Sequence, residues 1–173
     1  MKKWTIDPTH SEIGFKVKHM MFTNVKGHFD DYSAAIDFND DLKDANLQFE
    51  AKINSITTNN ADRDNHLKSA DFFDVDQYPT LNFKSTKIEG NGSEYAITGD
   101  LTIKGVTKPV KLNAEFSGLM TDPWGNTKVG LNIDGKINRK DFGLTYNAAL
   151  ETGGVLVGED VNLNAEIQLI EQK

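Results

Sequence analysis

The sequence predicts an all-β protein: an eight-stranded, antiparallel, up-and-down β-barrel with one or two short helices at the barrel ends. Apolar and polar residues alternate with period two along most of the 173-residue chain, which is typical of strands with one buried face. Short segments rich in turn-forming residues separate these stretches and favour antiparallel neighbours. Closing such a sheet buries every apolar face and leaves no exposed edge. A two-sheet sandwich is the alternative that periodicity leaves open.

The alternating segments are expected to form about eight strands of a single domain, residues 1–173. The clearest is 47–53, where Leu47, Phe49, Ala51 and Ile53 alternate with polar residues. In chain order the segments are 13–19, 25–29 leading to 36–38, 47–53, 81–83, 95–103, 110–116, 129–137 and 161–169. Tight turns are expected at 90–92, 104–106 and 123–126, where Gly and Asn tolerate left-handed backbone.

Two segments interrupt the alternation, 57–73 and 138–150. Each is long for a hairpin loop, and the first places Leu67 on a helical face. Each is therefore expected to form a short helix or an ordered loop across one end of the sheet.

The composition excludes several classes of function. There is no cysteine, so thiol nucleophiles, thiolate zinc sites and iron–sulfur clusters are ruled out. The formal charge of −7 argues against nucleic-acid partners and against docking on anionic lipid. The sequence has no run of about 18 apolar residues, so it predicts no membrane-spanning helix. Lys2 and Lys3 lead into a polar segment and not an apolar signal core, which predicts a cytoplasmic protein.

No motif recommends a metal, a cofactor or a catalytic residue. His10, His19, His28 and His66 lack the spacings that place two imidazoles on one face. His19 shares the phase of Ile13, and a hydrogen-bonded core histidine is favoured there over a ligand contact. A hydrolase or metal-dependent enzyme that uses His19 and acidic loop residues is one alternative function. A filled barrel that only binds other proteins is another.

The residues in the inward phase are apolar and of unequal size. Small residues mid-strand either leave room for a ligand or accommodate neighbouring phenylalanines, and the pattern supports both interpretations equally. A cavity here would accept an elongated apolar ligand, driven by transfer from water. The expected lining consists of Phe15, Val17, His19, Phe29, Phe49, Ala51, Ile53, Phe83, Gly99, Leu101, Ala114, Leu131 and Ile133.

Several motifs resemble the YceI-like family of lipocalin-like polyisoprenoid-binding proteins. They are Trp4-x-Ile6-Asp7-x-x-His10-Ser11, Arg63-Asp64-x-His66-Leu67-Lys68-Ser69-x-Asp71-Phe72-Phe73, Gly99-x-Leu101-Thr102-Ile103-x-Gly105 and Arg139-x-Asp141-Phe142-Gly143. The resemblance implies an extended eight-stranded barrel capped by short helices, with a long isoprenoid-type chain in an apolar tunnel. It also implies a homodimer in many members, and it carries no catalytic residues.

The chain has only two arginines, Arg63 and Arg139, and both fall in these motifs with an aspartate one or two positions on. One interpretation is that they meet an anionic head group at the barrel rim. The other, which we favour, is an Arg–Asp pair that fixes a long segment to the rim, because such a pair needs no ligand to explain it.

Overall fold

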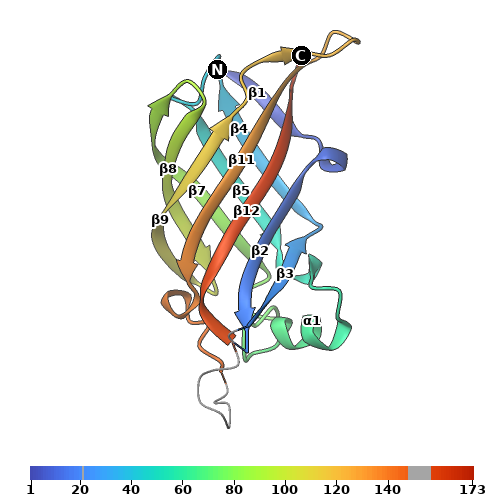
Figure 1. Cartoon of the computed structure of the whole chain (residues 1–173), viewed down its shortest axis with the longest axis vertical. Coiled ribbons are helices and arrows are strands. Elements are labelled where there is room, and N and C mark those ends of the chain that lie inside the picture. The colour runs from blue at the N-terminus through green and yellow to red at the C-terminus, as the bar shows by residue number, and fades with distance from the viewer. Residues whose placement is uncertain (21, 148–156) are drawn as a thin grey trace.

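The computed structural model describes residues 1–20, 22–147 and 157–173. One antiparallel sheet closes into a barrel, and within these ranges one α-helix lies at an end of it (Figure 1). The strands are β1 (Lys2–Ile6), β2 (Glu12–His19), β3 (Thr23–Phe29), β4 (Tyr32–Phe38), β5 (Asn46–Lys52), β6 (Ile56–Thr57), β7 (Thr80–Asn91), β8 (Glu94–Ile103), β9 (Val106–Phe116), β10 (Met120–Thr121), β11 (Thr127–Asn138) and β12 (Val157–Glu171). The helices are η1 (Pro8–His10), η2 (Ile53–Ser55), α1 (Ala61–Lys68) and η3 (Arg139–Phe142).

The prediction of an eight-stranded barrel is confirmed, although three of the eight barrel strands are interrupted. β1 and β2 both pair with β12, on either side of η1, where Pro8 has no N–H to donate to a sheet. Likewise β3 continues into β4, and β5 into β6. The β11–β12 ladder closes the ring, so the sandwich alternative is wrong.

The expected turns and end segments are also found. The β8–β9 turn uses Lys104 and Gly105 in left-handed conformation, with φ of 52° and 75°. Segment 57–73 contains α1, which begins where the Asn60 side chain accepts a hydrogen bond from the Arg63 amide at 3.0 Å. Segment 138–150 begins with η3, and residues 148–150 lie outside the described part of the chain.

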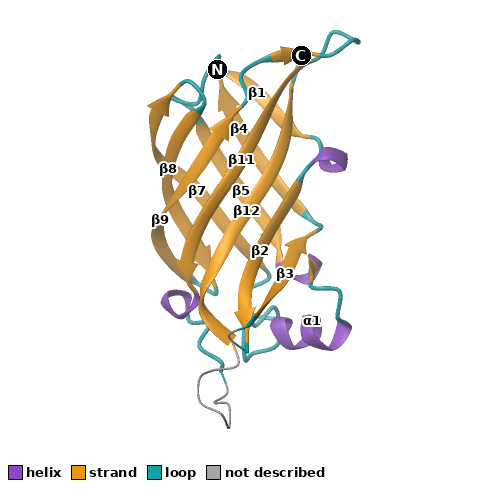
Figure 2. Cartoon of the chain, viewed as in Figure 1, coloured by secondary structure: helices purple, strands orange, loops and turns teal. Residues whose placement is uncertain are grey.

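The barrel has two different ends, which we call the termini end and the helix end (Figures 1 and 2). The chain termini, the β7–β8 turn and the β10–β11 hairpin lie at the termini end. α1, η3 and the β2–β3 turn lie at the helix end. Two clusters of buried apolar residues occupy the interior, one toward each end.

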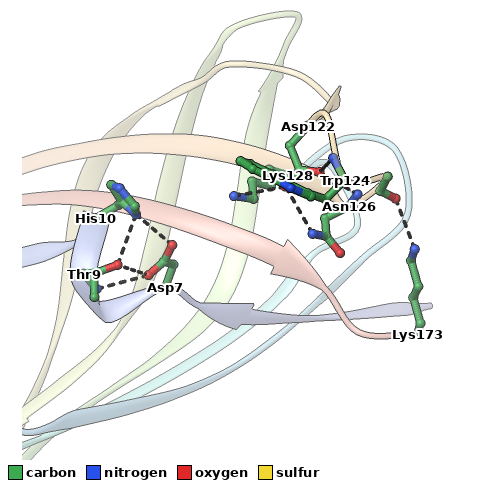
Figure 3. A network of polar contacts seen from close by, with 9 residues as sticks. Asp7, Thr9, His10, Asp122, Trp124, Asn126, Lys128 and Lys173 are labelled. Atoms are coloured by element: carbon green, nitrogen blue, oxygen red, sulfur yellow. Dashed lines mark hydrogen bonds and ion pairs between the residues drawn. The ribbon is translucent and has the colours of Figure 1, made fainter.

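An aspartate organises the β10–β11 hairpin at the termini end (Figure 3). The Asp122 carboxylate accepts hydrogen bonds from the Trp124 amide at 2.9 Å and the Asn126 amide at 2.8 Å. Lys128 Nζ lies 3.3 Å from the same carboxylate. The Asn126 hydrogen bonds are the main reason that the pKa of Asp122 lies below its usual range.

Candidate functional site: an internal apolar cavity

Aromatic rings close the termini end of the barrel. The rings of Trp4 and Phe38 stack with centroids 4.5 Å apart, and Phe116 meets Phe38 edge-on at 5.9 Å. Trp4 Nε1 donates to the Phe38 carbonyl at 3.1 Å, so the indole buries no unpaired donor. Each of these three side chains is at most 4% exposed. This layer fills the barrel interior at the termini end with packed rings.

Below the aromatic layer the barrel encloses a cavity of about 240 Å³. Its lining reaches from Ile167 near the termini end to Val157 at the helix end, both on β12. Ten residues of strand at about 3.3 Å each, tilted by about 40°, correspond to roughly 25 Å along the barrel axis. The cavity is therefore elongated, and Gln48, Arg139 and Asn164 are its only polar lining residues within the described part of the chain.

The burial of inward-facing residues along the strands is consistent with this cavity. Inward-facing residues near the ends of the barrel, such as Val129 and Ile53, are fully buried. Inward-facing residues at mid-height, such as Ile13, Phe49 and Ile133, are only half-buried although they lie inside the barrel. Part of each side chain packs against a buried cluster, and the rest faces the cavity. The filled-barrel alternative therefore does not describe this interior.

The glycines in the barrel wall accommodate neighbouring side chains. A Cβ on Gly27 would lie 2.4 Å from Phe15 Cζ, and one on Gly99 would lie 2.4 Å from Phe83 Cζ. Each phenyl ring thus packs directly on a glycine of the wall. Of the two interpretations of the small residues, accommodation holds at these two glycines.

Eight of the predicted lining residues do line the cavity. Phe15 and Val17 come from β2, and the others are distributed around the barrel. They are Phe15, Val17, Phe29, Phe49, Phe83, Leu101, Leu131 and Ile133.

The other five predicted lining residues lie outside the cavity. Ala51, Ile53 and Ala114 share the inward phase but pack tightly within the two buried clusters. Gly99 is covered by Phe83. His19 lies at the end of β2, paired with Thr23 and Val157, beyond the last lining residue of that strand. Period two identifies the face of a strand, but the height of the cavity along the strand depends on packing between distant segments.

Several lining residues were not predicted. Leu163 and Ala165 follow the same inward phase on β12 and were accessible to that reasoning. Leu67, Phe72 and Phe73 come from α1 and the turns after it, and they cover the helix end of the cavity. Strand periodicity does not predict these three residues, because the path of this segment across the barrel is a tertiary feature.

Arg139 is the one charged residue in the described lining, and it is 3% exposed. Its guanidinium donates to four main-chain carbonyls: Gly158 at 2.7 Å, Leu144 at 2.5 Å, Tyr146 at 2.9 Å and Val157 at 3.2 Å. Burial lowers the pKa of Arg139, and the charge of Glu159 opposes this shift. The Arg–Asp pair that the sequence favours is not formed at Arg139, whose partners are these main-chain carbonyls. Arg139 joins the segment after η3 to the start of β12.

Arg63 lies on α1, outside the cavity lining. Its Nε donates to Thr58 Oγ1 at 2.8 Å and its Nη2 to the Thr58 carbonyl at 2.7 Å. Asp64 accepts from the same threonine hydroxyl at 2.6 Å. The arginine and the aspartate thus meet at a shared threonine, which fixes the start of α1 to the chain that leads into it.

Aromatic contacts connect α1 to the segment after η3. The ring of His66 meets Phe72 and Tyr146 edge-on, at centroid distances of 5.0 and 4.8 Å. Its Nε2 lies 3.0 Å from Asp71 Oδ2.

Across residues 1–20, 22–147 and 157–173, no three His, Asp or Glu side chains are placed to hold a metal ion. No helix in the same ranges is long and apolar enough to cross a bilayer.

The fold and the cavity define a class: closed antiparallel barrels with an apolar interior suited to an apolar ligand. The particular family follows from comparison with known sequences. The model of the YceI-like domain matches residues 4–169, so the chain belongs to the YceI-like family. The UPF0312 protein SAS2572 of Staphylococcus aureus is 40% identical over 172 residues, which cover 97% of each chain.

Solved structures show the same fold. The crystal structure of the Campylobacter jejuni YCEI protein is 39% identical, with a TM-score of 0.78 and full coverage of both chains. Burkholderia cenocepacia BcnA has a TM-score of 0.80 at 21% identity, covering 94% of this chain and 98% of that one. A polyisoprenoid binding domain from Saccharophagus degradans has a TM-score of 0.72 at 14% identity, covering 99% and 100%. At these last two identities the likeness concerns the fold.

Proposed function

We propose that the cavity binds a long-chain apolar lipid, a polyisoprenoid in particular, and that the protein sequesters or transports this lipid without catalysis. The observation that carries the proposal is the elongated cavity whose lining, in the described part of the chain, is apolar except for three residues. Removing a hydrocarbon chain from water favours binding by about 25 cal/mol per Å² of apolar surface. The fold shared with the Saccharophagus degradans polyisoprenoid binding domain supports this ligand class.

The volume of the cavity limits how long a ligand fits without movement of side chains. A cavity of about 150 Å³ holds one benzene molecule, so the 240 Å³ found here corresponds to about ten carbon atoms. A longer chain needs side chains in the lumen to move. Phe49, Phe72 and Phe73 are large lining residues, and we expect their rotation to provide this space, because it leaves the barrel ladder intact. We therefore expect the bound protein to differ from this structure mainly in aromatic rotamers.

The direct test is mass spectrometry of organic extracts from the purified protein, followed by uptake of a polyprenyl lipid by delipidated protein. Ala165→Phe places a large ring inside the cavity and is expected to reduce uptake at least tenfold. Ala96→Phe is the matched control, because Ala96 lies in the outward phase of β8. The proposal fails if extracts hold no lipid and the delipidated protein takes up none. It also fails if both variants bind as the unchanged protein does.

His19 lies outside the cavity lining, which favours binding over catalysis by that residue. Turnover of a lipid ester that His19→Ala abolishes would support the enzyme alternative instead. A cytoplasmic location and a homodimer stay predictions of the sequence.

A further inference from the structure

We propose that the β2–β3 hairpin, at the helix end of the barrel, docks on a bilayer surface that contains anionic lipid. The proposal goes beyond ligand binding in the cavity, since it concerns the outer surface and a different partner. It rests on the lysines of the hairpin, on the exposed Met20 and Phe22, and on the position of the hairpin.

Three lysines share the outer face of the hairpin. Lys16 and Lys18 lie in the outward phase of β2, and Lys26 lies in the outward phase of β3. Lys16 and Lys26 are directly opposite in the β2–β3 register. Like charges in directly opposite positions destabilise a sheet. The arrangement therefore opposes folding, whereas an anionic surface would remove the repulsion.

Neighbouring carboxylates do not neutralise this face. Asn162 is opposite Lys16 on β12, and Asn24 is opposite Lys18 on β3. On the adjoining part of β12, Glu159 pairs with Lys140 at 2.7 Å and Asp160 with Lys136 at 3.9 Å. Within the described ranges none of the three hairpin lysines forms an ion pair. The net charge of −7 predicts no attraction to anionic lipid, but the fold concentrates unpaired positive charge on this hairpin.

Two apolar residues beside the turn between the strands, Met20 and Phe22, are exposed. The Phe22 side chain is 84% exposed and Met20 is 43% exposed. A large apolar side chain beside a cationic face is the combination that inserts at the interface of an anionic bilayer. A second copy of the chain is the less favoured occupant, because a two-fold interface centred on these lysines would bring like charges together.

The hairpin also lies next to the cavity. His19, the last residue of β2, pairs with Val157, which lines the helix end of the cavity. α1 lies beside the same end of the barrel (Figure 1). The aromatic layer fills the opposite end, so we expect a lipid from a bilayer to enter at the helix end.

The test is flotation with vesicles of phosphatidylcholine alone and of phosphatidylcholine mixed with phosphatidylglycerol, at low and high salt. Binding to the anionic vesicles at low salt is expected, with little binding to the neutral ones and loss at high salt. The variant K16Q/K18Q/K26Q is expected to bind about 100-fold more weakly, at about fivefold per lysine near the surface. F22S is expected to bind about tenfold more weakly.

Two matched controls distinguish docking through this hairpin from an effect of total charge or of any exposed aromatic side chain. K84Q/K87Q/K111Q removes the same charge from β7 and β9, across the barrel from β2. W124S removes an aromatic side chain that is 81% exposed at the termini end. Both are expected to bind anionic vesicles as the unchanged protein does.

The proposal is overturned if the unchanged protein does not bind anionic vesicles at low salt, or if each control weakens binding as much as its hairpin counterpart. A change of oligomeric state in the hairpin variants, with vesicle binding unchanged, would identify a second copy as the occupant and also overturn it. Lipid uptake measured in parallel without vesicles tests the cavity separately. Loss of docking with normal uptake therefore leaves the proposed function intact.

Discussion

The two ends of the barrel are closed by different physics. At the termini end, Trp4, Phe38 and Phe116 pack ring on ring with their polar atoms satisfied. At the helix end, a buried guanidinium and a helix segment hold the chain across the barrel. Close-packed rings have no second arrangement of similar energy, whereas hydrogen-bonded segments can open locally. The aromatic layer is therefore expected to stay closed, whereas the segments at the helix end are expected to open more readily.

The largest expected effect concerns the aromatic layer. Phe38→Ala removes a side chain that is 1% exposed and is expected to lower the free energy of unfolding by about 3–5 kcal/mol. Urea unfolding measures it. Trp124→Ala, at the same end but exposed, is expected to change it by less than about 0.5 kcal/mol. A small loss for Phe38→Ala would show that this end is loosely packed.

Arg139→Met is expected to cost about 3 kcal/mol, because four carbonyls lose a charged donor in a buried setting. Hydrogen exchange measured by mass spectrometry should show faster exchange in residues 143–147 and little change in β4. Uniform acceleration along the whole chain would mean that Arg139 supports the entire barrel and that the two ends do not differ.

Arg63→Gln is expected to cost about 1 kcal/mol, since it removes the hydrogen bonds to Thr58 at the start of α1. Lipid uptake by the variant should equal that of the unchanged protein. Asn60→Ala, which removes the helix cap, should have a similar cost and serves as the comparison. Reduced uptake in Arg63→Gln alone would revive the head-group interpretation of Arg63.

The smallest effect concerns pH at the termini end. The pKa of Asp122 is lower in the folded protein than its ordinary value of 3.8, so the ionised carboxylate stabilises the fold above that pH. This stabilisation is lost as the pH falls below 3.8 and through the lowered folded pKa. NMR shifts of the Trp124 and Asn126 amides, followed from pH 7 to pH 2, should report it. In Asp122→Asn the two amide shifts should show no transition in this range.

The features of the fold that depend on local sequence could be predicted. The alternation on 47–53 and 95–103 predicted β5 and β8 almost to the residue, because a strand with one buried face has a fixed period. It could not place the interruptions at η1 and between β3 and β4. For Arg139 it identified a residue of the barrel rim but proposed an aspartate partner. The actual carbonyl partners lie up to 19 positions away, and spacing cannot reveal them.

The sequence by itself determined the class of fold, the inward face of each strand and the apolar character of the interior. The tertiary structure decided the height at which the interior stays empty: Phe49 faces the cavity, while Ala51, two residues further on the same face, is fully buried. It also decided that three lysines of an acidic protein lie together on the β2–β3 hairpin. The reason is that a residue's period fixes only its direction, whereas packing density and local charge depend on which distant segments the closed barrel brings together.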